Sequence, residues 1–199
     1  MNYPDSLKKL IDSLKKLPTI GEKSAERLAF AIMDMDTDDV EAFSRSIIDA
    51  KYKIKKCIIC GNITENDVCD ICSSKNREED IICVVEDAKN IISLEKMGSY
   101  TGKYHVLGGL ISPMDGKGPE DIKVDSLVKR VKNDKIKEVI IAVSPTLEGE
   151  TTSLYISKLL EDMDVVVSKI AHGIPMGADM EYLDPMTLSM AMLNRNKIS

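Results

Sequence analysis

CIICGNITENDVCDIC, residues 57–72, is the stretch on which the reading of the whole chain depends. It contains two Cys-x-x-Cys pairs, Cys57/Cys60 and Cys69/Cys72. Each pair can present two thiolates to one cation, and the short loop between them can bring the pairs together as a tetrahedron. Four thiolates leave no position for water, so the spacing predicts one structural Zn²⁺ per chain. Gly61 follows the first pair, where a backbone that turns back on the metal needs freedom in φ.

Two disulfides, or four buried thiols without a metal, are the alternatives to zinc. We expect no signal peptide near Met1, so the thiols should remain reduced in the cytoplasm, which disfavours disulfides. The fifth cysteine, Cys83, lies within an apolar run and is expected to be a buried, inert thiol.

The composition limits the possible partners. The chain has 199 residues, of which 43% are hydrophobic and 30% are charged, as in a soluble protein of one or two modest domains. No apolar run approaches the ~20 residues of a membrane span. Residues 1–56 carry 11 Lys+Arg and 10 Asp+Glu (net +1), and the rest carries 16 and 23 (net −7), which gives the total of −6. A polyanion would therefore bind near the N-terminus.

Apolar periodicity predicts three helices before the cysteines. The first ends at Pro18, and its apolar face is formed by Leu7, Leu10, Ile11, Leu14 and Leu17. After a tight turn at Ile20-Gly21, the second begins near Glu22 and is expected to turn four residues inward: Ala25, Leu28, Ala29 and Ile32. The third begins in the acidic run Asp36–Asp39 and continues the apolar stripe through Val40, Phe43, Ile47 and Ile54.

The segment LPTIGEKSAERLAF, residues 17–30, resembles a helix-hairpin-helix DNA-binding motif. The resemblance implies that backbone amides near Gly21 and Ser24 point at a phosphate, with Lys23 and Arg27 adding positive charge. Such motifs often have glycine where this chain has Thr19. The alternative is an ordinary helical hairpin with a solvated basic rim. The lysine cluster KYKIKK, residues 51–56, is either a further phosphate contact or a neutralised helix C-terminus.

Beyond residue 77, buried apolar runs alternate with helical patterns. Strands are predicted at 81–85, 104–107, 139–143 and 165–167, with helices around 91–94, 124–131 and 154–160. This alternation predicts a parallel α/β sheet with helices on both faces. Functional groups in such sheets lie just beyond the carboxyl ends of the strands, where Glu86 and the predicted loop 144–150 are located.

Glu86 and the run SPTLEGE, residues 144–150, resemble the metal-binding segments of a Toprim domain. Ser144 and Thr146 occupy the two positions at which that pattern has aspartates, while Glu148 and Glu150 are retained. Hydroxyls are poor Mg²⁺ ligands, so we expect a Toprim fold with at most weak Mg²⁺ binding and no enzymatic activity. The phosphate loop Gly-x-x-x-x-Gly-Lys-[Ser/Thr] is absent from the sequence, and ATP hydrolysis is not expected.

The C-terminal tail is rich in methionine. It starts as an open Gly/Pro loop and ends in an apolar segment that contains Met186, Leu188, Met190, Met192 and Leu193. Such a segment either packs into the core or forms part of a subunit contact.

Taken in order, these motifs resemble the RecR family of bacterial recombination mediators. The motifs are LP-x-IG-x-KSA-x-R, the four-cysteine knuckle that ends at Arg77, CVVED, LGG-x-ISP-x-DG-x-GP-x-DI, PT-x-EGE and IAHG-x-P-x-G. The resemblance implies a multidomain α and α/β protein in four parts. These are a helix-hairpin-helix domain (1–53), a four-cysteine zinc knuckle (54–77), a Toprim domain (78–172) and a C-terminal oligomerisation tail (173–199).

The resemblance also implies a function without catalysis. Members act in DNA repair with RecO and RecF, help to load RecA on gapped single-stranded DNA, and form a ring-like tetramer able to encircle duplex DNA. By this resemblance the chain would be cytoplasmic and nucleoid-associated, and Glu86, Glu148 and Glu150 would face partner proteins. Two alternatives remain open. One is a Toprim nuclease or topoisomerase fragment that uses the same glutamates as metal ligands, and the other is a zinc-stabilised interaction protein that never contacts DNA.

Overall fold

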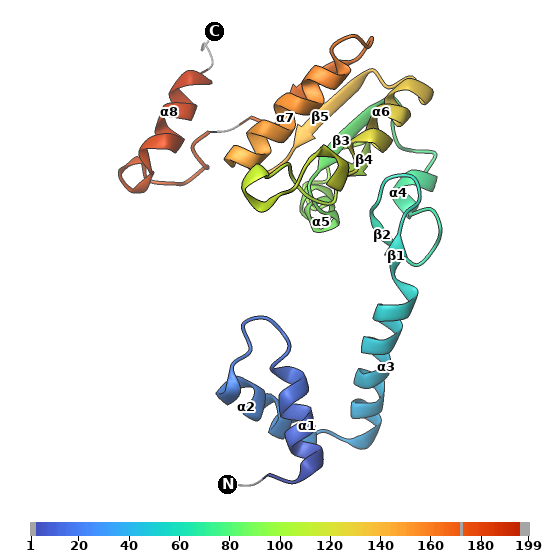
Figure 1. Ribbon diagram of the computed structural model, residues 1–199, viewed down its shortest axis with the longest axis vertical. Helices are drawn as coiled ribbons and strands as arrows, with labels where there is room; N and C mark the ends of the chain where they lie inside the picture. Colours follow the sequence, from blue (N-terminus) through green and yellow to red (C-terminus); the bar gives the residue numbers. More distant parts are fainter. Residues whose placement is uncertain (1–2, 172, 196–199) are drawn as a thin grey trace. The chain divides into compact units, whose positions relative to one another are not determined.

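The computed structural model describes residues 3–171 and 173–195 and divides at Ile54 into an N-terminal and a C-terminal unit (Figure 1). The predicted end of the Toprim domain at residue 172, and the last four residues of the predicted tail, lie outside the described residues.

The N-terminal unit is built on a pair of helices, α1 (Asp5–Leu14) and α2 (Glu22–Met33). Leu7 and Ile11 of α1 are buried against Ala25 and Ala29 of α2, whose small side chains allow the helices to approach closely. The prediction that Leu17 belongs to the apolar face of the first helix is wrong, because it is 52% exposed, and so is the prediction that Leu28 faces inward, because it is 38% exposed. Leu17 lies beyond the end of α1, in the turn.

Helix α3 (Thr37–Lys53) buries none of its residues. Its acidic first turn and its basic last turn, with Lys51 and Lys53, match the helix dipole as predicted. The predicted apolar stripe is exposed, however, with Phe43 at 46% and Ile47 at 56%. Among its described residues the unit has no further helix to cover this stripe, so within the N-terminal unit it is exposed.

The C-terminal unit begins with the knuckle. Strands β1 (Lys55–Lys56) and β2 (Ile63–Thr64) pair antiparallel, and the short helix α4 (Asp70–Ser73) carries the last cysteine. The sheet that follows contains β3 (Ile81–Val85), β4 (Lys103–Val106), β5 (Glu138–Ala142) and β6 (Val166–Lys169). Its strands lie in the order β4-β3-β5-β6, and every neighbouring pair is parallel.

Helices cover both faces of the sheet, so the predicted parallel α/β fold is confirmed (Figure 1). Side chains alternate along β3. Ile82 and Val84 enter the cluster that contains α6 (Val124–Asn133) and α7 (Leu147–Leu160). Cys83 and Val85 enter the opposite cluster with Ile91 of α5 (Ala88–Glu95). Burial raises the pKa of Cys83 to about 12, so this thiol stays protonated.

The connection between β5 and α7 is shorter than predicted. Helix α7 begins at Leu147, so Glu148 and Glu150 lie in its first turn and not in a loop. The Gly/Pro-rich connection after β4 forms two single turns of 3₁₀ helix, η1 (Pro113–Asp115) and η2 (Pro119–Asp121).

The tail contains a 3₁₀ turn, η3 (Met180–Tyr182), and helix α8 (Pro185–Leu193). Helix α8 has no buried residue, and Met186, Met192 and Leu193 are 72%, 66% and 71% exposed. Core packing, one of the two alternatives for this segment, is therefore not found among the described residues. None of the described helices has both the length and the apolar character that crossing a membrane requires.

Candidate metal centre and nucleic-acid interface

The four cysteines of the knuckle form a compact cluster. The Sγ atoms of Cys57, Cys60, Cys69 and Cys72 all lie within 4.8 Å of one another, and each side chain is buried. Two backbone amides support the sulfurs, because Asn62 N–H donates to Cys60 Sγ and Cys69 N–H donates to Cys57 Sγ, both at 3.4 Å. The four cysteines are free, so the disulfide alternative is excluded. This donor set fits one structural Zn²⁺ with no open coordination position.

The charge state of the cluster also favours a cation. The hydrogen bond from Cys72 is the main reason that the pKa of Cys60 falls to about 5. The same hydrogen bond, together with burial, raises the pKa of Cys72. Without a cation the thiols thus share protons, and a bound Zn²⁺ would supply the charge that allows all four to be thiolates.

The knuckle packs against the edge of the sheet. Val106 N–H, in β4, donates to the carbonyl oxygen of Cys60 at 2.8 Å. Gly61 has a φ of 79°, a left-handed backbone conformation that suits glycine at the turn after the first cysteine pair. It also lies close to β4, because an added Cβ would be 3.3 Å from Val106 Cβ. The metal cluster therefore fixes the segment that covers β4.

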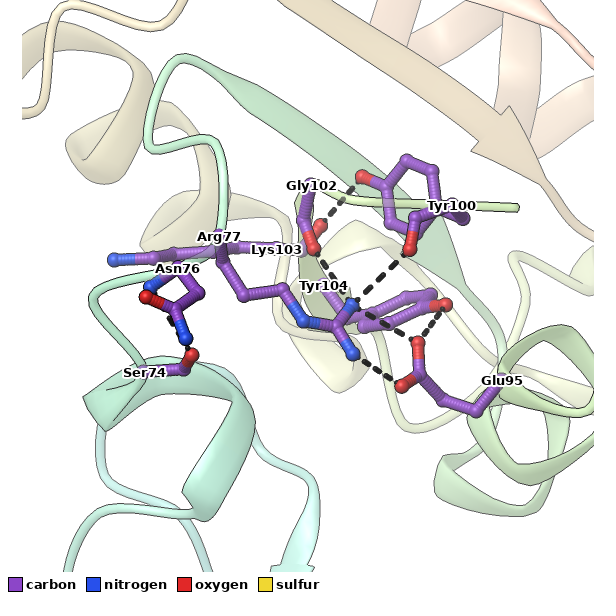
Figure 2. Close-up of polar contacts among 8 residues, drawn as sticks. All are labelled: Ser74, Asn76, Arg77, Glu95, Tyr100, Gly102, Lys103 and Tyr104. Atoms are coloured by element: carbon purple, nitrogen blue, oxygen red, sulfur yellow. Dashed lines mark hydrogen bonds and ion pairs between the residues drawn. The ribbon is translucent and has the colours of Figure 1, made fainter. Parts of the chain in front are cut away.

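Arg77 joins the end of the knuckle to the sheet (Figure 2). Its guanidinium group binds the Glu95 carboxylate, with Nη1 3.0 Å from Oε1 and a second bond from Nη2 to Oε2. Nη1 also donates to the carbonyl oxygens of Tyr100 and Gly102, at 3.4 and 3.2 Å. Tyr104 Oη donates to Glu95 Oε1 at 2.7 Å. The bond from Arg77 is the main reason that the pKa of Glu95 is lowered.

This polar network was not predicted from the sequence. Arg77 entered the sequence analysis only as the last residue of a motif, and its partner Glu95 lies 18 residues further along the chain. No local pattern relates an arginine to a carboxylate on a helix at such a separation.

The helical hairpin presents an open helix N-terminus. Gly21 precedes α2 with extended backbone (φ −84°, ψ 176°), and no side chain among the described residues caps the first turn. The first hydrogen bond of the helix runs from Ala25 N–H to Gly21 O at 2.9 Å, so the amides of residues 22–24 have no intrahelical acceptor.

The predicted basic residues lie one turn apart at this end of α2. Lys23 and Arg27 are both exposed, whereas Ser24 is half-buried. Within residues 3–171 and 173–195, neither Lys23 nor Arg27 forms an ion pair, in contrast to Lys15, which pairs with Glu22. This end of α2 therefore offers free amides and two free cations.

The carboxyl edge of the sheet does not gather the Toprim glutamates into a metal site. Ser144 Oγ donates to Glu86 Oε2 at 3.1 Å, and Glu150 forms an ion pair with Lys169. Thr146 caps α7 by accepting from Gly149 N–H at 3.2 Å. Across the part of the chain that the structure describes, the four cysteines are the one group arranged to hold a metal. Mg²⁺ binding is therefore not supported.

A helical hairpin, a four-cysteine knuckle and a parallel sheet with Toprim connectivity together define a zinc-binding Toprim protein with a helix-hairpin-helix domain. Family profiles agree over most of the chain. They match a Toprim domain at residues 80–171, the RecR helix-hairpin-helix at 7–51, the RecR four-cysteine zinc finger domain at 54–74 and the RecR C-terminal segment at 173–196.

Curated relatives give the same result over the full length. The chain is 51% identical over 198 residues to Recombination protein RecR of Staphylococcus aureus strain Newman and of strain USA300, with all of both chains covered. Identity to the protein of strain JH9 is 50% over the same span. The chain therefore belongs to the RecR family, which supports a role in DNA recombination and repair. The domain limits given in the sequence analysis stay predictions.

Proposed function

We propose that this protein is a DNA-binding recombination mediator that acts with RecO and RecF to help load RecA on gapped DNA. The observation that carries the proposal is the open N-terminus of α2, where amides and the side chains of Lys23 and Arg27 have no cap or ion-pair partner among the described residues. A helix N-terminus of this kind favours a phosphate, because its amides donate and its dipole attracts negative charge. Phosphate contacts carry no base specificity, as a mediator acting at any gap requires.

The proposed protein works as an oligomer, a ring-like tetramer that can encircle duplex DNA. Two exposed apolar surfaces support self-association. One is the α3 stripe with Phe43 and Ile47, and the other is α8 with Met186 and Met192. Apolar groups of this size that stay uncovered within their own unit are consistent with a contact with another chain.

The proposed function involves no catalysis and no Mg²⁺. Ser144 and Thr146 stand in place of metal-binding aspartates, and each hydroxyl is engaged in a structural hydrogen bond. Strand cleavage would need a metal held beside the scissile phosphate. The site of action would be the cytoplasm, at the nucleoid.

The function can be tested by RecA filament assembly on gapped DNA that is coated with single-strand-binding protein. With RecO and RecF present, the protein should shorten the lag before filaments form. If the lag is unchanged while the protein is folded and zinc-loaded, the mediator role is wrong.

We further propose that Glu86 and Glu148 belong to the surface that binds RecO. Glu86→Ala and Glu148→Ala should weaken RecO binding about tenfold, because loss of a charged contact at an interface costs on the order of 1–2 kcal/mol. Glu65→Ala, an exposed carboxylate on the knuckle, is the matched control and should bind as the unmodified protein does. Normal RecO binding by both variants would place the partner surface elsewhere.

The enzymatic alternative has a direct test. Purified protein with Mg²⁺ or Mn²⁺ should leave supercoiled and gapped DNA intact. Nicking that disappears in Glu86→Ala would instead assign the Toprim sheet a catalytic function.

A further inference from the structure

Helix α6 carries a concentration of positive charge in a unit that is otherwise acidic. Residues 55–199 hold 18 Lys+Arg and 23 Asp+Glu, a net charge of −5. Residues 123–137, which contain the helix, hold six and two, a net charge of +4, so the rest of the unit has a net charge of −9. The net charge of the unit therefore hides a local region to which a polyanion is attracted.

The cations of this region divide into paired and unpaired ones. Arg130 pairs with Asp134 at 3.6 Å, and Lys137 pairs with Asp80 at 2.8 Å. The other four, which we call the α6 lysines, are exposed and have no ion-pair partner among the described residues: Lys123, Lys129, Lys132 and Lys135. Four cations are thus available to a ligand.

The burial of α6 shows which of its residues meet solvent. Val124, Leu127 and Val131 are buried in the cluster that contains Ile82 and Val84 of the sheet. The exposed residues of the helix are all polar, and one of them is acidic: Asp125, Ser126, Lys129, Lys132 and Asn133. Lys129 and Lys132 are three residues apart, so they lie on the same side of the helix.

The composition of this side favours nucleic acid over protein as the ligand. The core of a protein–protein interface is enriched in apolar and aromatic residues and depleted of lysine. Helix α6 exposes no large apolar side chain. Contacts to a phosphate backbone need only positive charge and hydrogen-bond donors, which the α6 lysines supply.

The stability of the helix does not account for all four lysines. Positive charge is favourable at a helix C-terminus, which explains Lys132 in the last turn and Lys135 just after it. Lys123 is the N-cap residue, where the helix dipole disfavours a cation. Lys129 lies in the interior of the helix, where the dipole has little effect.

We propose that the α6 lysines form a second contact of this protein with the phosphate backbone of DNA. Each lysine neutralises a phosphate as a point charge and reads no base. The inference rests on the proposed DNA binding and deepens it, because it assigns a contact to the C-terminal unit in addition to the hairpin. The salt dependence of DNA binding is then steeper than Lys23 and Arg27 alone produce.

The test measures duplex DNA binding by the full chain at several salt concentrations. Lys129→Ala and Lys132→Ala should each lower the slope of log K against log salt by about one, and the double variant should lower it by about two. Lys132→Arg keeps the charge and should keep the slope. Lys89→Ala, an exposed lysine of α5 on the opposite face of the sheet, is the matched control and should bind as the unmodified protein does.

The outcomes separate the inference from the proposed function. An unchanged slope in the double variant, while Lys23→Ala and Arg27→Ala lower it, would overturn the α6 contact and leave the hairpin interface intact. Unchanged DNA binding together with weaker RecO binding would overturn it too and assign these lysines to a protein partner. An unmodified protein that binds no DNA would overturn both the inference and the proposed function.

Discussion

At the scale of single residues, Thr19 occupies the position in the hairpin turn at which helix-hairpin-helix motifs often have glycine. Its φ of 70° places a β-branched residue in the left-handed region, where such side chains are rare. The next glycine, Gly21, has extended backbone that any residue can adopt, and nothing lies within 4 Å of an added Cβ. The conformational requirement for glycine therefore falls on residue 19, where the sequence does not have one.

Thr19→Gly should stabilise the N-terminal unit. The left-handed conformation costs a non-glycine residue roughly 1–2 kcal/mol, and the greater freedom of glycine in the unfolded chain offsets about half of this. We expect a gain of up to about 1 kcal/mol in the free energy of unfolding by urea titration. Gly21→Ala is the control and should change the stability little. A Thr19→Gly variant less stable than the original would show that the left-handed conformation of Thr19 is not strained.

His105 makes the C-terminal unit sensitive to acid. Burial is the main cause that lowers its pKa to about 4, while Nε2 lies 2.9 Å from the carbonyl oxygen of Lys123. The unfolded chain has a histidine pKa near 6.5, so between the two values the unfolded state binds the proton and the folded state does not. Stability is therefore full above about pH 6.5 and falls as the pH drops towards about 4.

Between about pH 7 and about pH 5 this single group should cost about 2 kcal/mol of the free energy of unfolding. His105→Gln cannot take up the proton, and its unfolding free energy should fall less over the same range. The comparison isolates the histidine from other groups, and equal pH dependence in both proteins would show that His105 is not responsible.

Residues with a local signal could be predicted, and residues with distant partners could not. Cysteine spacing located the metal cluster because both pairs lie in one short stretch. The contact of Arg77 with Glu95, and the burial of His105 beneath α6, depend on how the sheet and its helices pack. Nothing in the neighbouring sequence encodes that packing.

At the scale of elements, the turn from β5 into α7 depends on Gly149. An added Cβ would lie 1.8 Å from the carbonyl oxygen of Ser144, a backbone atom that cannot move aside cheaply. The same turn holds the Ser144–Glu86 hydrogen bond and the Thr146 cap. The absence of a side chain is therefore what allows the strand to turn directly into the helix.

Gly149→Ala should destabilise the C-terminal unit by on the order of 2–4 kcal/mol, since the helix start or the strand end must shift. Gly173→Ala is the matched control, because nothing lies within 4 Å of its added Cβ. The midpoint of urea unfolding measures both. A Gly149→Ala protein with an unchanged midpoint would contradict the close approach of residue 149 to the carbonyl oxygen of Ser144.

The strands were easier to predict than the surfaces of the helices. Short apolar runs mark all four strands to within one or two residues, because the strands of a covered parallel sheet are largely apolar. Apolar periodicity also predicts α3, but it cannot tell a face that packs within the chain from one that another chain covers. The start of α7 at Leu147 was not predicted, since residues 144–150 were expected to form a loop and the helix was expected only around 154–160.

At the scale of the whole molecule, the zinc knuckle protects one edge of the sheet. Val106 N–H of β4 donates to Cys60 O, so the knuckle covers the edge of β4 at this point. Arg77, at the end of the knuckle, binds Glu95 of α5. Loss of the metal should therefore detach the knuckle from β4, and an uncovered edge strand is a site for aggregation.

Cys57→Ser should lower zinc content and thermal stability before it affects DNA binding. Structural zinc contributes on the order of 10 kcal/mol in small zinc-finger peptides, so a missing ligand acts first on folding. Metal analysis, thermal melting and light scattering should show less zinc, a lower Tm and aggregation. Cys83→Ala, which removes a cysteine outside the cluster, should keep one zinc per chain. Metal-free protein that melts like the zinc-loaded form would contradict the structural role.

The most direct test of the account is the salt dependence of DNA binding by the hairpin variants. Lys23→Ala and Arg27→Ala should each weaken binding to duplex and gapped DNA of any sequence, and each should lower the slope of log K against log salt by about one. Lys9→Ala, an exposed lysine on α1 outside the segment 17–30, should leave both affinity and slope unchanged, and all three proteins should keep the original Tm. Unchanged affinity and slope for both hairpin variants would contradict the proposed DNA interface.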